Sequence, residues 1–157
     1  MYKSNIRSVG TNDALQDSRN SPIDKIGERM DKLLDTLFEK IPDTTIVLST
    51  LLIDTHEGVN RRIRKTINPQ YQAIVKRRQD AKQRIVLADM YPAVNYKDLI
   101  DGTHPNDKGY RAMAKVWLEA IQLAGDSEML VEPHTLPDEE NQPQSTPTPT
   151  SEPGWMD

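Results

Sequence analysis

The sequence predicts an α/β fold built around a parallel sheet. Two short runs, Thr45–Leu48 and Arg84–Asp89, are rich in β-branched and aliphatic residues and have the composition of buried strands. Segments with apolar residues at helical spacing alternate with them, and this alternation favours parallel strands joined by right-handed crossovers. The length of 157 residues fits one domain.

The amino-terminal part of the chain predicts one strand and one helix. Ile6–Val9 is a weak strand candidate, because Arg7 stands where a central parallel strand is normally apolar. Ser21 and Pro22 then predict the start of a helix, with Ser21 as its N-cap, that continues to about Lys40. Its core-facing stripe consists of Ile23, Ile26, Met30, Leu33, Leu34, Leu37 and Phe38.

The second half of the predicted domain holds two more helices around the strand Arg84–Asp89. Residues 60–82 favour a helix that is interrupted at Pro69. A loop from Met90 to Pro105 precedes a last helix, which Asn106 or Asp107 caps. The inward residues of that helix are Tyr110, Met113, Val116, Trp117, Ala120 and Ile121. Three strands make a small sheet, so the chain is interpreted as the carboxyl-terminal part of a larger domain.

Charge divides the chain near Gly125. All 20 Lys and Arg residues precede residue 116, whereas eight acidic residues and no basic ones follow Gly125. The segment Asn141–Pro153 is rich in Pro, Thr, Ser and Gln, a composition that buries little apolar surface. We therefore expect a folded domain over residues 1–124 and a disordered acidic tail or linker over residues 125–157.

Several classes of protein are excluded by composition. The chain has no cysteine, which rules out a disulfide scaffold and thiol-based zinc or catalytic chemistry. No run of about 18 apolar residues is present, so no transmembrane helix is expected. Residues 1–10 also lack the apolar core of a signal peptide, and none is expected in this chain.

Asp101 and His104 form the most informative candidate for chemistry. A carboxylate three residues before a histidine, on a loop that feeds a helix, can hold one ring nitrogen and leave the other as a general base. Taken alone, the same spacing also fits a structural cap or a pair of surface residues.

Gly10, Asn12 and Asp13 follow the first strand candidate in the motif Gly-Thr-Asn-Asp. Open α/β sheets place ligand-binding loops at the carboxyl ends of their strands, and an amide there can donate to a developing oxyanion. Taken alone, the motif is also a strand-ending turn rich in turn formers.

Together the two motifs resemble the SGNH (GDSL-type) hydrolase superfamily. Gly-Thr-Asn-Asp at residues 10–13 and Asp-Gly-Thr-His-Pro-Asn-Asp-Lys-Gly-Tyr at residues 101–110 are similar to the carbohydrate esterase family 3, the acetylxylan esterases. The resemblance covers about residues 6–123. It implies a flavodoxin-like three-layer α/β/α sandwich that lacks its first strands.

The same resemblance implies a reaction and a set of roles. The reaction is ester hydrolysis through an acyl-serine, without a metal or an organic cofactor. His104 would be the catalytic base, Asp101 its orienting acid and Asn12 an oxyanion-hole donor, with Gly10 and Asp13 supporting the motif. The implied substrate is an acylated carbohydrate or another small ester, the implied location is extracellular, and no membrane partner is expected.

The nucleophile of that family is expected to be absent from this chain. The family carries it in a Gly-Asp-Ser block upstream of the Gly-x-Asn-Asp motif, and the nine residues before Gly10 contain no such block. Ser49 follows a predicted strand but lacks the small neighbours of a nucleophile turn. The alternative function is therefore a catalytically inactive remnant with at most carbohydrate or polyanion binding.

Two further features have competing interpretations. The stretch Arg61–Arg84 holds nine basic residues and one acid, and such a stretch could bind a polyanion. A solvated helix face is the favoured interpretation, and a nucleic-acid partner is not expected. Asp54 and His56 could form half of a metal site, but a surface loop after a strand is favoured.

Overall fold

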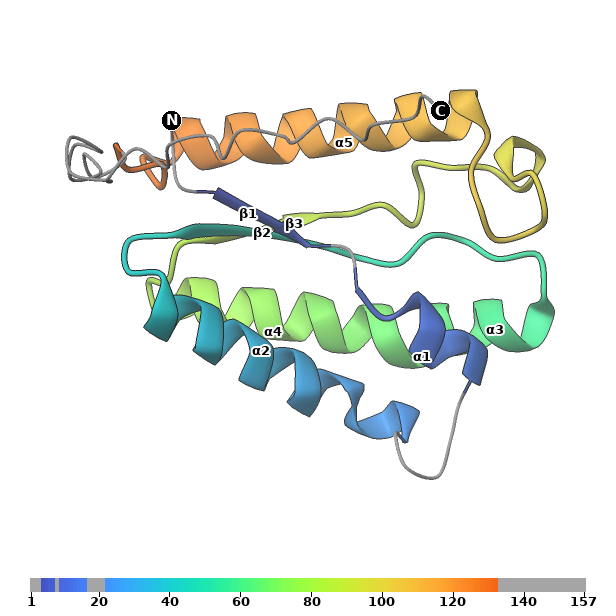
Figure 1. The fold of residues 1–157 in the computed structure, drawn as a ribbon, viewed down its shortest axis with the longest axis horizontal. Coiled ribbons are helices and arrows are strands. Elements are labelled where there is room, and N and C mark those ends of the chain that lie inside the picture. The colour runs from blue at the N-terminus through green and yellow to red at the C-terminus, as the bar shows by residue number, and fades with distance from the viewer. Residues whose placement is uncertain (1–3, 8, 17–21, 133–157) are drawn as a thin grey trace, which may run out of the picture.

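The computed structural model describes residues 4–7, 9–16 and 22–132, which form a three-layer α/β/α arrangement (Figure 1). Strands β1 (Ser4–Arg7), β2 (Thr45–Ser49) and β3 (Ile85–Ala88) make a parallel sheet in the order β1-β2-β3. The predicted α/β class, a partial sandwich around a small parallel sheet, is confirmed.

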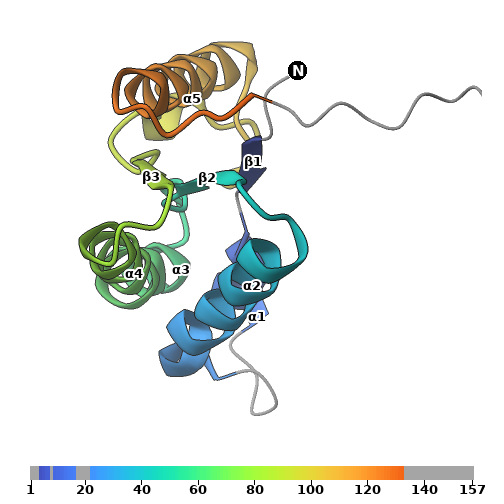
Figure 2. The same ribbon diagram turned by 90° about the vertical axis from the view of Figure 1, so that its left-hand side faces the viewer.

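Helices cover both faces of this sheet (Figure 2). One face carries the helices that precede β3, and α5 covers the other. The connection from β1 to β2 and the connection from β2 to β3 therefore cross the same face of the sheet. This is required when both crossovers are right-handed and the strands are added in one direction. The helical elements are α1 (Thr11–Gln16), η1 (Ile23–Lys25), α2 (Ile26–Lys40), α3 (Glu57–Arg62), η2 (Ile63–Ile67), α4 (Asn68–Asp80), η3 (Tyr96–Asp98) and α5 (Asp107–Asp126).

Two cores lie on the two faces of the sheet. Successive residues of a strand point to opposite faces. Ile46 and Leu48 therefore join the core beneath α2 and α4, whereas Val47 and Val86 join the core beneath α5. Because both faces are covered, all five residues of β2 are buried, which explains the run of β-branched and aliphatic residues from Thr45 to Leu48.

The predicted strands and the first long helix are confirmed with shifted ends. β1 begins at Ser4, two residues earlier than the predicted strand start. The helix opens with the 3₁₀ turn η1 and becomes α-helical at Ile26. The predicted N-cap, Ser21, lies outside the described residues.

The predicted interruption at Pro69 is wrong. The chain stays helical from Glu57 to Asp80 because the π-helical turn η2 lies directly before the proline. There the backbone N–H of Asn68 donates to the carbonyl of Ile63, five residues back. The widened turn places Pro69 in the first turn of α4, where a missing N–H costs little.

The segment after β1 is helical. The strand-ending turn, one of the two interpretations of Gly10–Asp13, is replaced by a short helix, α1, whose first turn holds Thr11, Asn12 and Asp13. The N–H of Ala14 donates to the carbonyl of Gly10 at 3.1 Å, which closes that turn. Six residues are too few to show a helical periodicity in the sequence.

The last helix begins where the sequence predicts. The Asn106 side chain caps it by accepting a hydrogen bond from the N–H of Gly109 at 3.0 Å. α5 continues to Asp126, so the change of composition at Gly125 falls within its last turn. Among the described residues, no helix combines the length and the apolar character needed to cross a bilayer.

Candidate functional site

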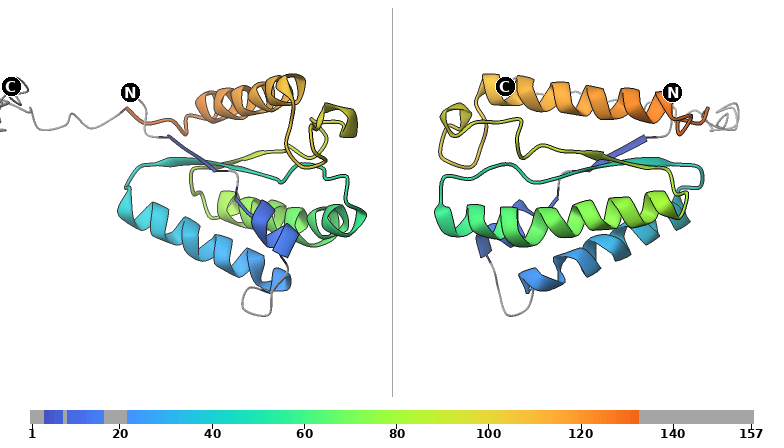
Figure 3. Two further views of the ribbon diagram at one scale, coloured as in Figure 1. Left: turned by 45° about the vertical axis from the view of Figure 1, so that its right-hand side comes forward. Right: turned by 180° about the vertical axis from the view of Figure 1, so that it is seen from behind.

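Three segments leave the carboxyl edge of the sheet (Figure 3). Because the strands are parallel, the segments that leave β1, β2 and β3 all emerge at this edge. They carry Gly10–Ala14, Asp54–His56 and Asp101–His104, respectively. The fold thus places at one edge of the sheet two motifs that lie about ninety residues apart in the sequence.

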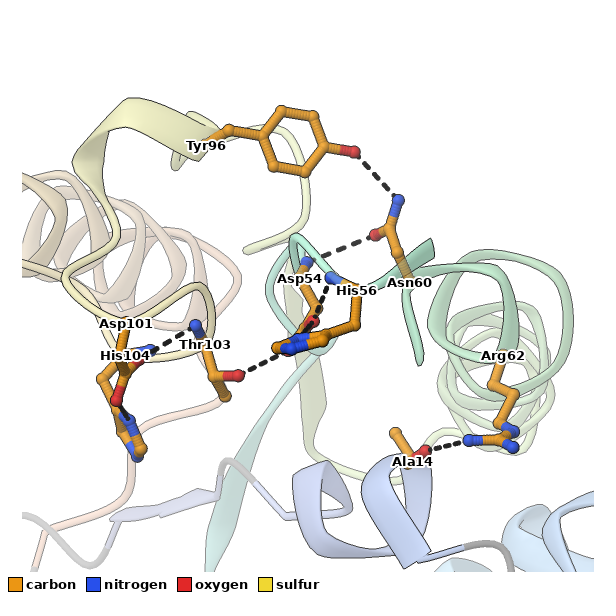
Figure 4. Close-up of polar contacts among 9 residues, drawn as sticks. All are labelled: Ala14, Asp54, His56, Asn60, Arg62, Tyr96, Asp101, Thr103 and His104. Atoms are coloured by element: carbon orange, nitrogen blue, oxygen red, sulfur yellow. Dashed lines mark hydrogen bonds and ion pairs between the residues drawn. The ribbon is translucent and has the colours of Figure 1, made fainter. Parts of the chain in front are cut away.

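Asp101 and His104 form a closed, hydrogen-bonded turn (Figure 4). One carboxylate oxygen of Asp101, Oδ2, lies 2.7 Å from Nδ1 of His104. The other, Oδ1, accepts from the backbone N–H groups of Thr103 at 3.0 Å and of His104 at 2.8 Å. The side chains of Asp101 and His104 are more than half exposed, so this carboxylate–imidazole pair faces solvent.

These bonds favour the charged form of the Asp101 carboxyl group. The backbone N–H and the ring of His104, together with the N–H of Thr103, hold the pKa of Asp101 well below its usual range. An ionised carboxylate at Nδ1 requires the neutral ring to carry its proton there. In that tautomer Nε2 of His104 is a lone-pair acceptor, which is the form that a general base needs.

The backbone of this turn depends on a glycine. Gly102 has φ +92°, and a Cβ added there would collide with the hydroxyl of Thr55. The absence of a side chain lets the two loops approach, and the N–H of Thr55 donates to the carbonyl of Gly102 at 2.9 Å. The loop after β2 therefore supports the Asp101–His104 turn directly.

Asp54 lies at the junction of these two loops (Figure 4). Its side chain is only 2% exposed, so the expectation of a plain surface loop is wrong for this residue. Its Oδ2 accepts from the hydroxyl of Thr103 at 2.7 Å, and its Oδ1 accepts from the backbone N–H of His56 at 2.7 Å. The same Oδ1 lies 3.0 Å from Nδ1 of His56.

The metal interpretation of Asp54 and His56 is not supported by a ligand set. No cluster of three or more His, Cys, Asp or Glu residues suited to a metal ion occurs within the described ranges. Instead, Asp54 binds protein donors on two loops, a role that the sequence analysis missed. Asp54 and Thr103 are 49 residues apart, and no local pattern in the sequence links them.

Asn60 extends the network toward the loop that follows β3. The residue is 5% exposed, and its Oδ1 accepts from the N–H of Asp54 at 3.3 Å and from the Tyr91 hydroxyl at 3.2 Å. Its Nδ2 donates to the hydroxyl of Tyr96 at 3.0 Å. Asn60 therefore links the loop after β2 to the segment after β3 at several points.

Asn12 lies exposed on the first turn of α1, at the same edge of the sheet as His104. Its neighbour Asp13 has a structural contact, an ion pair with Arg29 of α2 at 2.7 Å. Arg62 of α3 donates to the carbonyl of Ala14 at 2.9 Å. These contacts fix α1 against two other helices and so fix the position of Asn12.

Gly10 is buried beneath this short helix. Its φ is +120°, and an added Cβ would lie 2.6 Å from the hydroxyl oxygen of Tyr71. That hydroxyl donates to the carbonyl of Val9 at 3.0 Å, and its burial raises the pKa of Tyr71. Gly10 thus allows the chain to leave β1 in close contact with α4.

No serine in the described residues stands at a nucleophile position beside His104. Ser49 is fully buried within β2. A Gly-Asp-Ser tripeptide does occur at Gly125–Ser127, but Ser127 is the C-cap of α5. This helix of 20 residues starts beside His104 and is about 30 Å long, which puts Ser127 at the opposite edge of the sheet.

The basic stretch between Arg61 and Arg84 is occupied largely by contacts within the protein. Arg78 is buried against Asp31 and Asp35, and Arg77 also pairs with Asp31. Lys76 pairs with Asp80 and Arg84 pairs with Asp43, while Arg62 donates to the carbonyl of Ala14. These contacts favour the interpretation as a structural helix face.

The fold and the site define a class of protein. A parallel sheet between helical layers, with an exposed carboxylate–histidine pair on the loop after its last strand, is typical of α/β domains that place reactive groups at the carboxyl edge. The chain belongs to the GDSL-like lipase/acylhydrolase family, whose model matches residues 6–112. The predicted membership of this superfamily is confirmed.

Several known proteins are similar to this chain. A multidomain esterase of Ruminococcus flavefaciens is 35% identical over 117 residues, which cover 73% of this chain and 15% of that protein. A carbohydrate esterase family 3 structure from Talaromyces cellulolyticus superposes with a TM-score of 0.65 at 22% identity. A family 3 carbohydrate esterase of Clostridium thermocellum gives 0.62 at 19%.

The chain spans only part of these relatives. The Talaromyces comparison covers 79% of this chain and 59% of the solved one, and the Clostridium comparison covers 80% and 59%. At these identities the solved structures establish the shared fold. They also confirm the predicted similarity to carbohydrate esterase family 3 at the level of fold.

Proposed function

We propose that this chain provides the base, its orienting acid and one oxyanion donor of a serine-type ester hydrolase. The observation that carries the proposal is the 2.7 Å contact between Asp101 Oδ2 and His104 Nδ1, on a histidine whose side chain is 69% exposed and whose Nε2 is left to act as the acceptor. Asn12, at the same edge of the sheet, is assigned as the oxyanion donor.

In the proposed reaction, Nε2 of His104 takes the proton of a serine hydroxyl as its oxygen attacks the ester carbonyl. Asp101 stabilises the imidazolium that forms, and the Asn12 amide donates to the oxyanion. The imidazolium then protonates the departing alcohol, and a water activated by the same nitrogen releases the acid. By family resemblance, the attacking serine is assigned to a Gly-Asp-Ser block that would precede residues 1–9, which contain no such block.

We propose an acylated carbohydrate as the substrate, and acetyl as the acyl group. Support comes from the family 3 carbohydrate esterases that share the fold and from the multidomain esterase that shares the sequence. An extracellular location is proposed on the same grounds, because an enzyme that acts on polymeric carbohydrates has to reach them outside the cell.

The test begins by sequencing the 5′ end of the transcript, so that the protein assayed is the one encoded in full. Acetate release from acetylated xylo-oligosaccharides is then measured for this protein and for His104→Gln. We expect the variant to lose at least about 10³-fold in turnover, because a triad member is removed. Turnover that is unchanged in His104→Gln would contradict the assignment.

A second outcome favours the alternative function. If the transcript begins at Met1 and the encoded protein releases no acetate, the chain is a catalytically inactive member of the family. Its remaining activity would then be binding, and retention on a carbohydrate or heparin matrix would measure it. Charge reversal of Arg61 and Arg64 separates polyanion retention from carbohydrate retention.

A further inference from the structure

The structure assigns a role to Asp54 that rests on the proposed function. We propose that Asp54, acting through the hydroxyl of Thr103, is a positioning residue that holds Asp101 and His104 in the geometry of a general base. Asp54 belongs to the loop after β2, whereas the pair belongs to the loop after β3. The contact between them crosses from one loop to the other.

The catalytic pair needs such support because it is exposed. The side chains of Asp101 and His104 are 55% and 69% exposed, so packing restrains them little. A free surface turn would exchange among several conformations, and a base that is displaced by about 1 Å loses much of its effect. The restraint therefore has to come from hydrogen bonds to the turn.

Thr103 is well placed to provide that restraint. It lies between Gly102 and His104, and its own N–H donates to Asp101 Oδ1 at 3.0 Å. Its hydroxyl donates in the other direction, to Asp54 Oδ2 at 2.7 Å. Thr103 therefore bonds the orienting acid with its backbone and the buried carboxylate with its side chain.

Asp54 is itself held in a single orientation. Its N–H donates to the Asn60 side chain, while its Oδ1 is occupied by the N–H and Nδ1 of His56. This division leaves Oδ2 directed at Thr103 (Figure 4). Since its side chain is 2% exposed, little water competes for the Thr103 hydroxyl, and a bond from a hydroxyl to a carboxylate is stronger than one between neutral groups.

The decisive experiment removes the Thr103 hydroxyl with little change in volume. We compare Thr103→Val, Thr103→Ser and Asp54→Asn, using the acetate-release assay for kcat and KM. Thr36→Val is the matched control, because the Thr36 hydroxyl is exposed on α2 and bonds only its own helix, at the carbonyl of Lys32. The second readout is the ¹⁵N imidazole spectrum of His104, which reports the nitrogen that carries the proton.

We expect Thr103→Val and Asp54→Asn to lower kcat by about 10- to 100-fold with KM nearly unchanged, because the base is misplaced while substrate binding is retained. The His104 signals should move from the Nδ1–H form toward a mixture of tautomers. Thr103→Ser should restore both readouts, and Thr36→Val should change neither. Asp54→Asn also changes a buried group and can therefore impair folding. If the Asp54→Asn protein is poorly folded, the Thr103 variants alone test the proposal.

Two results would overturn the proposal. One is a Thr103→Val protein with wild-type kcat and an unchanged tautomer spectrum. The other is an effect of similar size on KM alone, which would assign Thr103 to substrate binding. If the wild-type protein releases no acetate, the proposed function fails, and the tautomer spectra of the folded chain still decide whether Asp54 orders the pair.

Discussion

At the scale of single residues, Asp101 links the chemistry of the site to pH. Its pKa is lowered in the folded chain from the ordinary value of 3.8, because the turn donates three hydrogen bonds to the charged form. A group of this kind stabilises the fold above its unfolded pKa, and the contribution is lost as pH falls through the lower folded pKa.

This sign gives a prediction for Asp101→Asn. The free energy of unfolding of the variant should lie below that of the wild type at pH 6, and the two should converge as the pH falls below 3.8. Urea unfolding at a series of pH values measures the difference. A constant difference from pH 6 to pH 2 would show that the carboxylate is not selectively stabilised in the folded state.

Gly10 gives a second prediction at this scale. Gly10→Ala should destabilise the fold by about 1–3 kcal/mol, because φ is positive and the new methyl meets the Tyr71 hydroxyl. In Gly10→Ala/Tyr71→Phe the clashing oxygen is absent, so the double variant should be more stable than the sum of the single effects predicts. Thermal unfolding of the wild type, the two single variants and the double variant completes this double-mutant cycle. Strictly additive changes in the free energy of unfolding would contradict the clash.

At the scale of elements, α2 and α4 are joined by Arg78. Its guanidinium side chain is 6% exposed, pairs with Asp31 and Asp35, and lies 5.9 Å from the centroid of the Phe38 ring. Arg78→Ala should cost about 2–3 kcal/mol, somewhat less than the loss of a fully buried pair because both aspartates keep some solvent contact.

Arg77 is the matched control for Arg78. It also pairs with Asp31, but its side chain is 61% exposed. Arg77→Ala should therefore cost less than about 1 kcal/mol, as is usual for exposed ion pairs. Equal losses for the two variants in denaturant unfolding would refute the distinction based on burial.

The elements also show which parts of the fold can be read from the sequence. β2 and β3 are predicted well because strands buried on both faces must be apolar throughout. The helix break predicted at Pro69 is wrong because a π-helical turn directly before the proline accommodates it. That turn leaves no signature in the pattern of apolar residues. The Asp101–His104 pair is local and therefore visible, whereas the contact of Thr103 with Asp54 forms only after β2 and β3 pair.

At the scale of the whole molecule, the domain boundary is open to a direct test. Ala124 is fully buried, and Met129 and Leu130 pack on the core beneath α5. A chain that ends at Glu132 should therefore keep the stability of the full chain, whereas one that ends at Ala124 should lose about 1–3 kcal/mol. Thermal unfolding separates the two, and equal stabilities would place the boundary at Gly125.

The parallel register has a consequence for the kinetics of folding. Ser4 pairs with Thr45 and Ile46 pairs with Ile85, so each strand pairing closes a loop of about forty residues before it gains any contact. Such topologies fold in milliseconds to seconds, far more slowly than helical bundles of similar size. Since Asp54 and Thr103 meet only when the second of these loops has closed, the ordered Asp101–His104 turn should be among the last features to appear during refolding.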